Sequence, residues 1–106
     1  MVDVLDLVRQ AAQKKILFSP HAVGQMSHPD RMISTAEVRE VITKGHVVED
    51  YPNDHRGHSC LIGGDTLEKR HVHVVCSPKE DYLAIVTAYL PLEEDWERGF
   101  RRRRKP

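Results

Sequence analysis

The sequence predicts an α+β fold in which N-terminal helices pack on a four-stranded antiparallel meander that a C-terminal helix follows. Apolar residues recur at helical spacing before residue 45, and the period changes to alternation between residues 46 and 89. Turn-forming residues separate the alternating runs. The chain has 106 residues, enough for one hydrophobic core, and no apolar run approaches the roughly 18 residues of a membrane span. We therefore expect one domain over residues 1–100, a tail over residues 101–106, and a cytoplasmic protein without membrane contact.

Two helices are predicted near the N-terminus. Apolar residues at helical spacing predict the first over residues 4–14, with Asp3 as its N-cap. Residues 16–18 are apolar and form either a short strand or an extended link. Ser19 followed by proline is typical of a helix start, which places His21 in the first turn of the second helix.

A third helix is predicted with a capping box at its start. Ser34 and Glu37 have the spacing at which each side chain binds the other's backbone N–H group. Gly45 ends this helix, and we expect it in the left-handed conformation. The residues predicted to face the core are Val38, Val41 and Ile42.

The four strands of the meander follow in order. Residues 46–51 and 59–63 form the first two, and residues 70–89 form a hairpin with a polar loop. Residues 92–104 are predicted to form the closing helix, with Trp96 and Phe100 four positions apart on one side.

The hairpin is expected to have one apolar face and one mixed face, because side chains alternate along a strand. Regular pairing places these residues on the mixed face: His71, His73, Val75, Leu83, Ile85, Thr87 and Tyr89. The other face consists of Val72, Val74, Cys76, Ala84, Val86 and Ala88, and is predicted to join the core.

Two histidines one residue apart on a strand have the geometry that can chelate zinc. His71 and His73 are such a pair, and His46, His58 or Asp50 would have to supply a third ligand. The same pattern is typical of a polar strand face, and no cofactor is predicted.

The mixed face also carries groups suited to metal-independent RNA cleavage. That reaction needs a base for the ribose 2′-hydroxyl, a cation beside the phosphate and an acid for the 5′ oxygen. His21 and His73 would supply acid and base, Arg70 the cation, and Thr87 and Tyr89 would orient the substrate. The alternative is that these residues reflect helix entry, β-propensity and solvation.

The basic residues are concentrated at the C-terminus. Residues 1–100 hold 11 Lys and Arg against 16 Asp and Glu, and the tail brings the net charge to zero. Such a run binds nucleic acid or an acidic partner, or is simply solvated. The residues concerned are Arg101, Arg102, Arg103, Arg104 and Lys105. The sequence has no phosphate-binding glycine loop and no Gly-x-Ser-x-Gly motif, which argues against nucleotide hydrolysis and serine-hydrolase chemistry.

From about residue 16 to residue 104 the chain resembles a small prokaryotic family, the domain of unknown function numbered forty-two fifty-eight. Its marks here are Phe18-Ser19-Pro20-His21-Ala22 with Met26, Ile33-Ser34, Glu37-Val38, Gly45 with Val48-Glu49-Asp50-Tyr51, Ser59-Cys60-Leu61, His73-Val74-Val75, and Thr87-Ala88-Tyr89 with Trp96. The resemblance implies a RelE-like fold and an RNA-cleaving or ribosome-associated activity. Members tend to carry an arginine before the methionine, where this chain has Gln25, so Arg31 or Arg70 would have to replace it at a phosphate.

Three hypotheses follow. The first is a metal-independent ribonuclease of toxin–antitoxin type that acts on RNA or the ribosome. The second is a non-catalytic module of the same fold that binds a partner protein such as an antitoxin, and the third is a small metal-binding protein that uses His71 and His73. The oligomeric state has no signal in the sequence.

Overall fold

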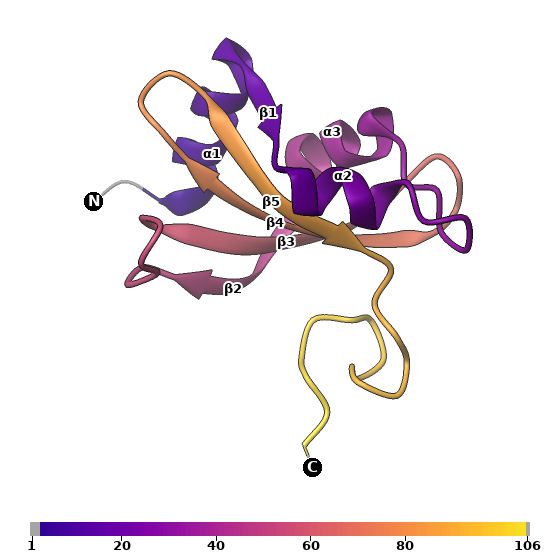
Figure 1. Cartoon of the computed structure of the whole chain (residues 1–106). Helices are drawn as coiled ribbons and strands as arrows, with labels where there is room; N and C mark the ends of the chain where they lie inside the picture. The colour runs from indigo at the N-terminus through magenta and orange to yellow at the C-terminus, as the bar shows by residue number, and fades with distance from the viewer. Residues whose placement is uncertain (1–2, 106) are drawn as a thin grey trace.

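The computed structural model describes residues 3–105 and has three helices beside a five-stranded mixed sheet. The helices cover one face of the sheet, and the C-terminal segment lies against the other (Figure 1). The elements are α1 (Val4–Lys14), β1 (Ile16–Phe18), α2 (Pro20–Met26), α3 (Thr35–Lys44), β2 (His46–Tyr51), β3 (Ser59–Asp65), β4 (His71–Pro78) and β5 (Leu83–Tyr89). The α+β class is thus confirmed.

The predicted helix starts are confirmed. The side chain of Asp3 accepts a hydrogen bond from the backbone of Leu5 at the start of α1, and Ser19 caps α2. The capping box of Ser34 and Glu37 is complete at α3, with both reciprocal bonds in place. These bonds satisfy N–H groups that have no partner within the helix.

The expected conformation of Gly45 is wrong. Its φ of −77° and ψ of −173° are extended rather than left-handed. A Cβ atom there would clash with the carbonyl oxygen of Val41 and lie 2.6 Å from that of Gly63. Glycine is required at this position because α3 approaches β3 backbone to backbone.

The sheet has one more strand than the predicted meander. β2, β3, β4 and β5 pair antiparallel in sequence order, whereas β1 adds at the edge and runs parallel to β5. Residues 16–18 are therefore a strand and not merely a link. The four-stranded antiparallel description holds only for β2–β5.

A β-bulge changes the faces of β5. Val75 pairs with Thr87, but Cys76 pairs with Ile85, so that Val86 is the extra residue. The bulge turns Leu83 and Ile85 to the helix side, where both are fully buried. Their predicted place on the histidine face is wrong, because regular alternation does not continue through an inserted residue.

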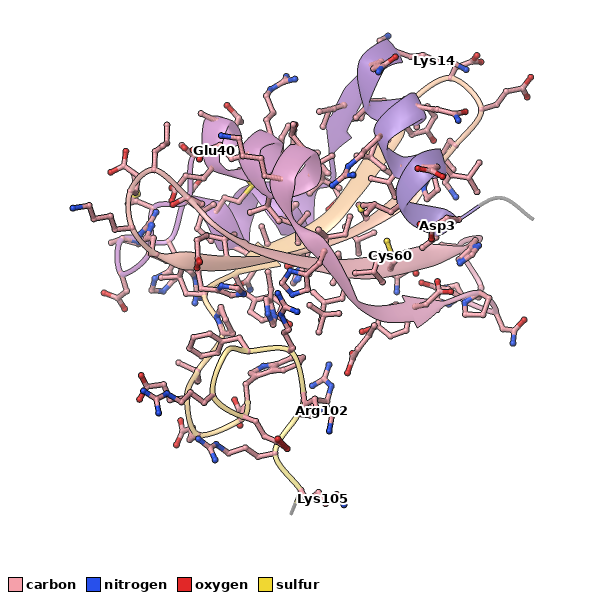
Figure 2. The ribbon with its side chains drawn as sticks, turned by 180° about the vertical axis from the view of Figure 1, so that it is seen from behind. Asp3, Lys14, Glu40, Cys60, Arg102 and Lys105 are labelled. Atoms are coloured by element: carbon pink, nitrogen blue, oxygen red, sulfur yellow. The ribbon has the colours of Figure 1, made fainter. Side chains whose placement is uncertain are left out.

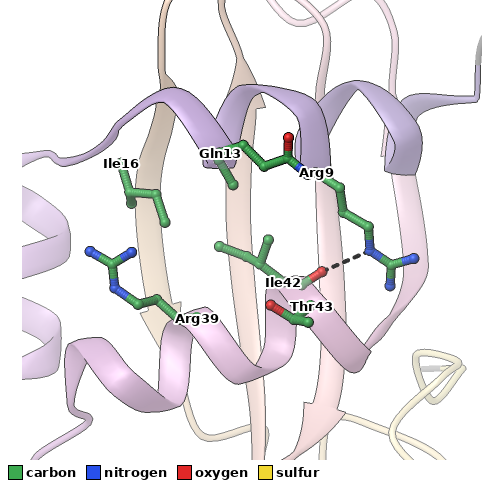
Figure 3. Close-up of a pocket in the computed structure, with 7 residues that line it drawn as sticks. Arg9, Gln13, Ile16, Arg39, Ile42 and Thr43 are labelled. Carbon is green, nitrogen blue, oxygen red and sulfur yellow. Dashed lines mark hydrogen bonds between the residues drawn. The ribbon is translucent and has the colours of Figure 1, made fainter.

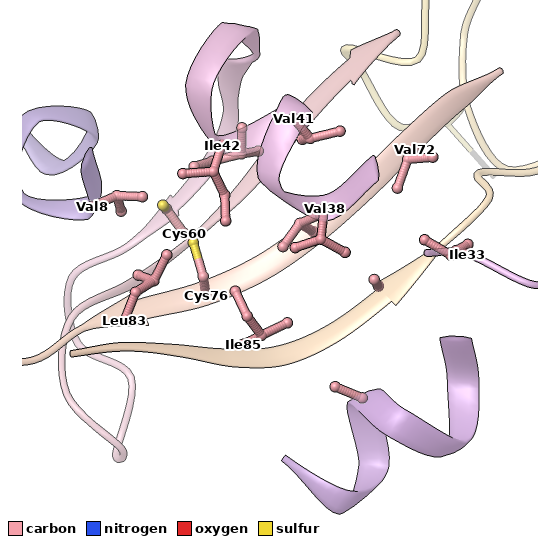
Figure 4. Close-up of a cluster of buried hydrophobic side chains, with 14 of the residues drawn as sticks. Val8, Ile33, Val38, Val41, Ile42, Cys60, Val72, Cys76, Leu83 and Ile85 are labelled. Atoms are coloured by element: carbon pink, nitrogen blue, oxygen red, sulfur yellow. The ribbon is translucent and has the colours of Figure 1, made fainter. Parts of the chain in front are cut away.

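The core lies between the helices and the sheet (Figure 4). Cys60 and Cys76 are paired in register across β3 and β4, and both are buried free thiols. The hydrogen bond with the Cys60 thiol, followed by burial, raises the pKa of Cys76 well above its ordinary value. The two cysteines therefore serve as small apolar residues of the core.

The predicted helix over residues 92–104 is wrong. This segment consists of turns, and its two parts meet at an isolated bridge between Trp96 and Arg103. Gly99 has φ +91° and Phe100 has φ +59°. These two residues reverse the direction of the chain between the two parts of the segment. Burial of Trp96, which is 3% exposed, outweighs the helix propensity of the surrounding charged residues.

Within residues 3–105, none of the helices has the length and apolar character needed to span a membrane. Residues 1, 2 and 106, which belong to the two predicted ranges 1–100 and 101–106, lie outside the described residues.

Candidate functional site

An open groove of about 930 Å³ lies on the sheet face opposite the core. It runs along β4 and β5 beside β1 and the start of α2, and we call it the open-face groove. Its floor is formed by apolar and small side chains of these strands. Its polar lining residues include His21, Arg56, Lys79, Tyr82 and Thr87. The groove thus collects an imidazole, two cations and several hydroxyl groups.

The start of α2 is fixed to β5 at the bulge. The backbone N–H of Ser19 donates to the carbonyl oxygen of Ile85 at 3.0 Å, and its hydroxyl donates to that of Val86 at 2.9 Å. The same hydroxyl oxygen accepts from the N–H of Ala22 at 3.0 Å. His21 stands within this anchored turn, and its exposed side chain lines the same groove as Thr87.

The two cations of the groove were not among the predicted site residues. Arg56 belongs to the loop between β2 and β3, and Lys79 to the loop between β4 and β5. The ammonium group of Lys79 donates to the carbonyl oxygen of Arg56. Alternate loops of an antiparallel meander lie at the same end of the sheet. The predicted strand order could therefore have placed Arg56 and Lys79 near each other.

His73 does not reach the groove. It is fully buried: its Nε2 lies 3.0 Å from the carbonyl oxygen of Phe100, and its Nδ1 lies 3.2 Å from the hydroxyl of Tyr89. Because a carbonyl only accepts, Nε2 carries the proton and Nδ1 accepts from Tyr89. Burial lowers the pKa of His73 to about 4 and raises the pKa of Tyr89. His73 is therefore neutral near pH 7.

Arg70 also lies apart from His21, at the opposite end of β4. Its guanidinium donates to both carboxylate oxygens of Glu37, at 2.7 and 2.9 Å, and to the carbonyl oxygens of Arg31 and Met32. The pKa of Glu37 is lowered to about 2, chiefly by this hydrogen bonding from Arg70. Arg31 itself donates to the carbonyl oxygen of Gln25 at 3.1 Å. Arg70 thus joins the loop before α3 to the sheet.

His71 lies at the end of β4 and is bonded to Asp65 at 2.8 Å. His58, in the loop between β2 and β3, is bonded to Asp50 of β2, away from His71. Nowhere in residues 3–105 do three His, Cys, Asp or Glu side chains converge in a way that could hold a metal ion. His46 lies near the pair, with its ring centre 6.5 Å from that of His71, but the three rings do not converge as zinc ligands.

The basic C-terminal residues are divided between two environments. Arg103 donates to Glu49 at 2.8 and 3.1 Å and lies 4.6 Å from the centre of the Trp96 ring. Arg104 donates to the carbonyl oxygen of Glu93 at 2.6 Å. Arg101, Arg102 and Lys105 are exposed as well, and Figure 2 shows Lys105 at the end of the segment farthest from the sheet.

A second, smaller groove of about 330 Å³ lies on the helical side, between α1 and α3. Figure 3 shows Arg9 and Arg39 near its ends with Ile42 between them. Arg9 donates to the carbonyl oxygens of Ile42 and Gly45, both at 3.1 Å. These bonds satisfy carbonyl groups at the end of α3, so Arg9 has a structural task there.

Of the five predicted catalytic residues, the structure brings His21 and Thr87 into one groove and places His73 and Tyr89 together under the C-terminal segment. Arg70 belongs to neither pair.

Comparison with known proteins adds one match. A family described as "Domain of unknown function (DUF4258)" matches residues 18–90, which is more than half of the chain. The match begins at Phe18, the last residue of β1, and ends just beyond β5, so it contains the lining of the open-face groove except Leu17. Neither a curated protein nor a solved structure matches the chain.

Proposed function

This chain belongs to the family described as a domain of unknown function (DUF4258), and from that premise we propose that it is a metal-independent endoribonuclease of toxin–antitoxin type. The observation that carries the proposal is the composition of the open-face groove. It holds the imidazole of His21, the cations of Arg56 and Lys79, and the hydroxyl of Thr87 on one accessible surface. The likeness to RelE-like toxins, with RNA or the ribosome as cytoplasmic target and an antitoxin as partner, is part of the proposal.

The groove supplies each element of phosphodiester cleavage at a ribose. His21 would accept the proton of the 2′-hydroxyl, whose oxygen then attacks the neighbouring phosphorus. Arg56 and Lys79 would stabilise the additional negative charge on the phosphate. The bond to the 5′ oxygen breaks, and this oxygen takes a proton from His21 in its protonated form or from Lys79.

The anchoring of α2 gives His21 the fixed position that proton transfer requires. Two hydrogen bonds from Ser19 to the bulge on β5 hold the first turn of α2 against the strand that carries Thr87. Catalytic contributions of this kind depend on placing the base within hydrogen-bond reach of the proton. In this proposal Arg70 has the structural role that its ion pair with Glu37 indicates.

The test uses the full chain and a single-stranded RNA oligonucleotide in the presence of EDTA, with an all-deoxy oligonucleotide as substrate control. We expect cleavage of the RNA alone. His21→Ala and Lys79→Gln should each lower the rate by about 10²-fold or more. His28→Ala changes a half-exposed histidine outside the groove and should cleave like the wild type. Equal cleavage by His21→Ala and the wild type would refute the proposal.

A second candidate function is favoured by the apolar floor of the groove. Leu17 is 46% exposed on the edge strand β1, next to Val75 and Val86. An extended segment of a partner protein, such as an antitoxin, can add to such an edge and place side chains in the groove. A stable complex with the product of a neighbouring gene, weakened by Leu17→Asp, together with a lack of RNA cleavage by the free chain, would favour this function.

A further inference from the structure

The C-terminal segment, residues 91–105, is attached to the sheet in an unusual way. Within residues 91–105, each backbone hydrogen bond joins two residues of the segment itself, such as Glu97 to Arg102 and Arg104 to Asp95. The sheet contributes no backbone partner to it. The segment also lies beyond the family match, which ends at residue 90. It is therefore a separate set of turns that packs on the sheet without pairing with any of its strands.

Side chains hold the segment in place at three points. The ring of Trp96 packs edge-on against His73, with 4.6 Å between ring centres. Phe100 stacks on His71 at 5.1 Å, and its carbonyl oxygen accepts from His73. Arg103 forms the exposed ion pair with Glu49, an interaction that contributes about 1 kcal/mol or less.

The segment leaves hydrogen-bonding groups of the sheet surface beneath it without partners. The Nε2 atoms of His46 and His71 are buried and lack a hydrogen-bond partner. A buried unpaired polar atom costs on the order of 1–3 kcal/mol. Phe100 adds the cost of a left-handed backbone conformation in a bulky residue. These costs reduce the free energy that must be supplied to lift the segment.

The covered surface continues directly into the open-face groove. His73 pairs with Tyr89 across β4 and β5, and Val75 pairs with Thr87 in the next row of the same face. The first row lies beneath Trp96 and Phe100, whereas the second row lines the groove. Lifting the segment would therefore lengthen the groove by the surface that contains His73 and Tyr89.

We infer that residues 91–105 form an autoinhibitory cover over the histidine end of the groove, and that single-stranded RNA displaces it. This inference rests on the proposed function. In the covered state RNA reaches only the part of the groove that holds His21, Arg56, Lys79 and Thr87. In the uncovered state the phosphate backbone also lies over His46, His71 and His73, whose ring nitrogens are then free to donate to it.

The test uses Trp96, the only tryptophan of the chain, as a reporter of the cover. Arg103→Gln removes the ion pair with Glu49, and Phe100→Ala removes the ring that stacks on His71. Arg102→Gln is the matched control, because it removes the same charge from the adjacent exposed position. We expect a red-shifted Trp96 emission and faster trypsin cleavage after Arg98 and Arg101 in the first two variants only. For Arg103→Gln the gain should be up to about 5-fold, which corresponds to the roughly 1 kcal/mol or less that the ion pair contributes.

Affinity for a non-cleavable 2′-O-methyl RNA then decides whether the segment inhibits. Arg103→Gln and Phe100→Ala should bind more tightly than Arg102→Gln, by up to about 5-fold for Arg103→Gln, and RNA should shift Trp96 emission in the wild type. Unchanged emission and proteolysis in both variants would show a fixed part of the core and overturn the inference. If the two variants open the segment and the wild type binds the RNA, but the variants bind it no more tightly, the inference is also overturned. If neither the wild type nor the opened variants bind RNA, the proposed function fails as well, and the emission alone still records whether the segment opens.

Discussion

Arg70 and Glu37 form a bidentate, partly buried ion pair that joins the residue before β4 to the start of α3. The Nη2 and Nε atoms of Arg70 lie 2.7 and 2.9 Å from the two carboxylate oxygens, and the Glu37 side chain is 3% exposed. Thr66 donates a further hydrogen bond to Glu37 at 2.9 Å. A residue predicted to bind phosphate is thus engaged in stabilising the fold.

Breaking this pair should destabilise the protein. Glu37→Gln leaves the guanidinium of Arg70 without its charged partner, and we expect the free energy of unfolding to fall by about 3 kcal/mol. Glu80→Gln, which removes an exposed carboxylate, should change it by less than about 0.5 kcal/mol. Urea denaturation followed by circular dichroism measures both. Equal stability of the two variants would contradict the structural role of the pair.

The same pair predicts a loss of stability in strong acid. The pKa of Glu37 is lowered from 4.5 to about 2 in the folded protein. A lowered carboxyl pKa contributes stability above pH 4.5 that disappears as the pH falls to about 2, on the order of 3 kcal/mol in total. Denaturation series at pH 5 and pH 2.5 should therefore differ less in Glu37→Gln than in the wild type. A parallel decline in both proteins would assign the acid sensitivity to other groups.

Protonation of His73 predicts a second loss of stability on acidification, in a pH range above that of Glu37. Burial lowers its pKa from 6.5 to about 4, so the unfolded chain binds a proton that the folded chain excludes between these values. Stability that is complete above pH 6.5 should decline by about 3 kcal/mol as the pH falls to about 4. NMR titration of the ring protons of His73 should give the low pKa directly.

The variant His73→Gln should flatten the stability profile between pH 6.5 and pH 4, because it removes the titrating group. His28→Gln changes a half-exposed histidine and should retain the decline. A titration of His73 near 6.5 would contradict its burial under the C-terminal segment.

Two glycines should respond oppositely to the same substitution. Gly45→Ala places a methyl group against backbone carbonyl oxygens of α3 and β3, so we expect a loss of about 2 kcal/mol or more. Gly24→Ala in α2 meets no atom within 4 Å and should increase stability by about 0.5 kcal/mol. Thermal unfolding monitored by circular dichroism measures both variants. A stabilised Gly45→Ala would show that α3 and β3 have room to separate.

Local patterns were sufficient to predict the helix starts and the antiparallel strands. Ser19, Ser34 and Glu37 act on backbone groups within a few positions, so their effect is visible in a short window of sequence. The parallel pairing of β1 with β5 depends on a partner about 67 positions away, as the bond from Ser19 to Val86 illustrates. No local signal identifies such a partner.

The candidate site was predicted in part for the same reason. His21 and Thr87 were expected on one surface, and the anchored start of α2 brings them to one groove. The burial of His73 depends on how residues 91–105 fold back, and their helical spacing pointed to a different conformation. Periodicity describes one segment at a time, whereas burial depends on the segments that cover it.

The pairing of β1 with β5 has a consequence for the order in which the protein forms. Ile16–Phe18 can join the sheet only through Leu83, Ala84 and Ile85, which are among the last residues of the family region to be synthesised. The anchored position of His21 depends on the same strand, through the bonds from Ser19 to Ile85 and Val86. A nascent chain that ends before β5 therefore has no assembled groove, and the proposed activity is withheld until β5 has been synthesised.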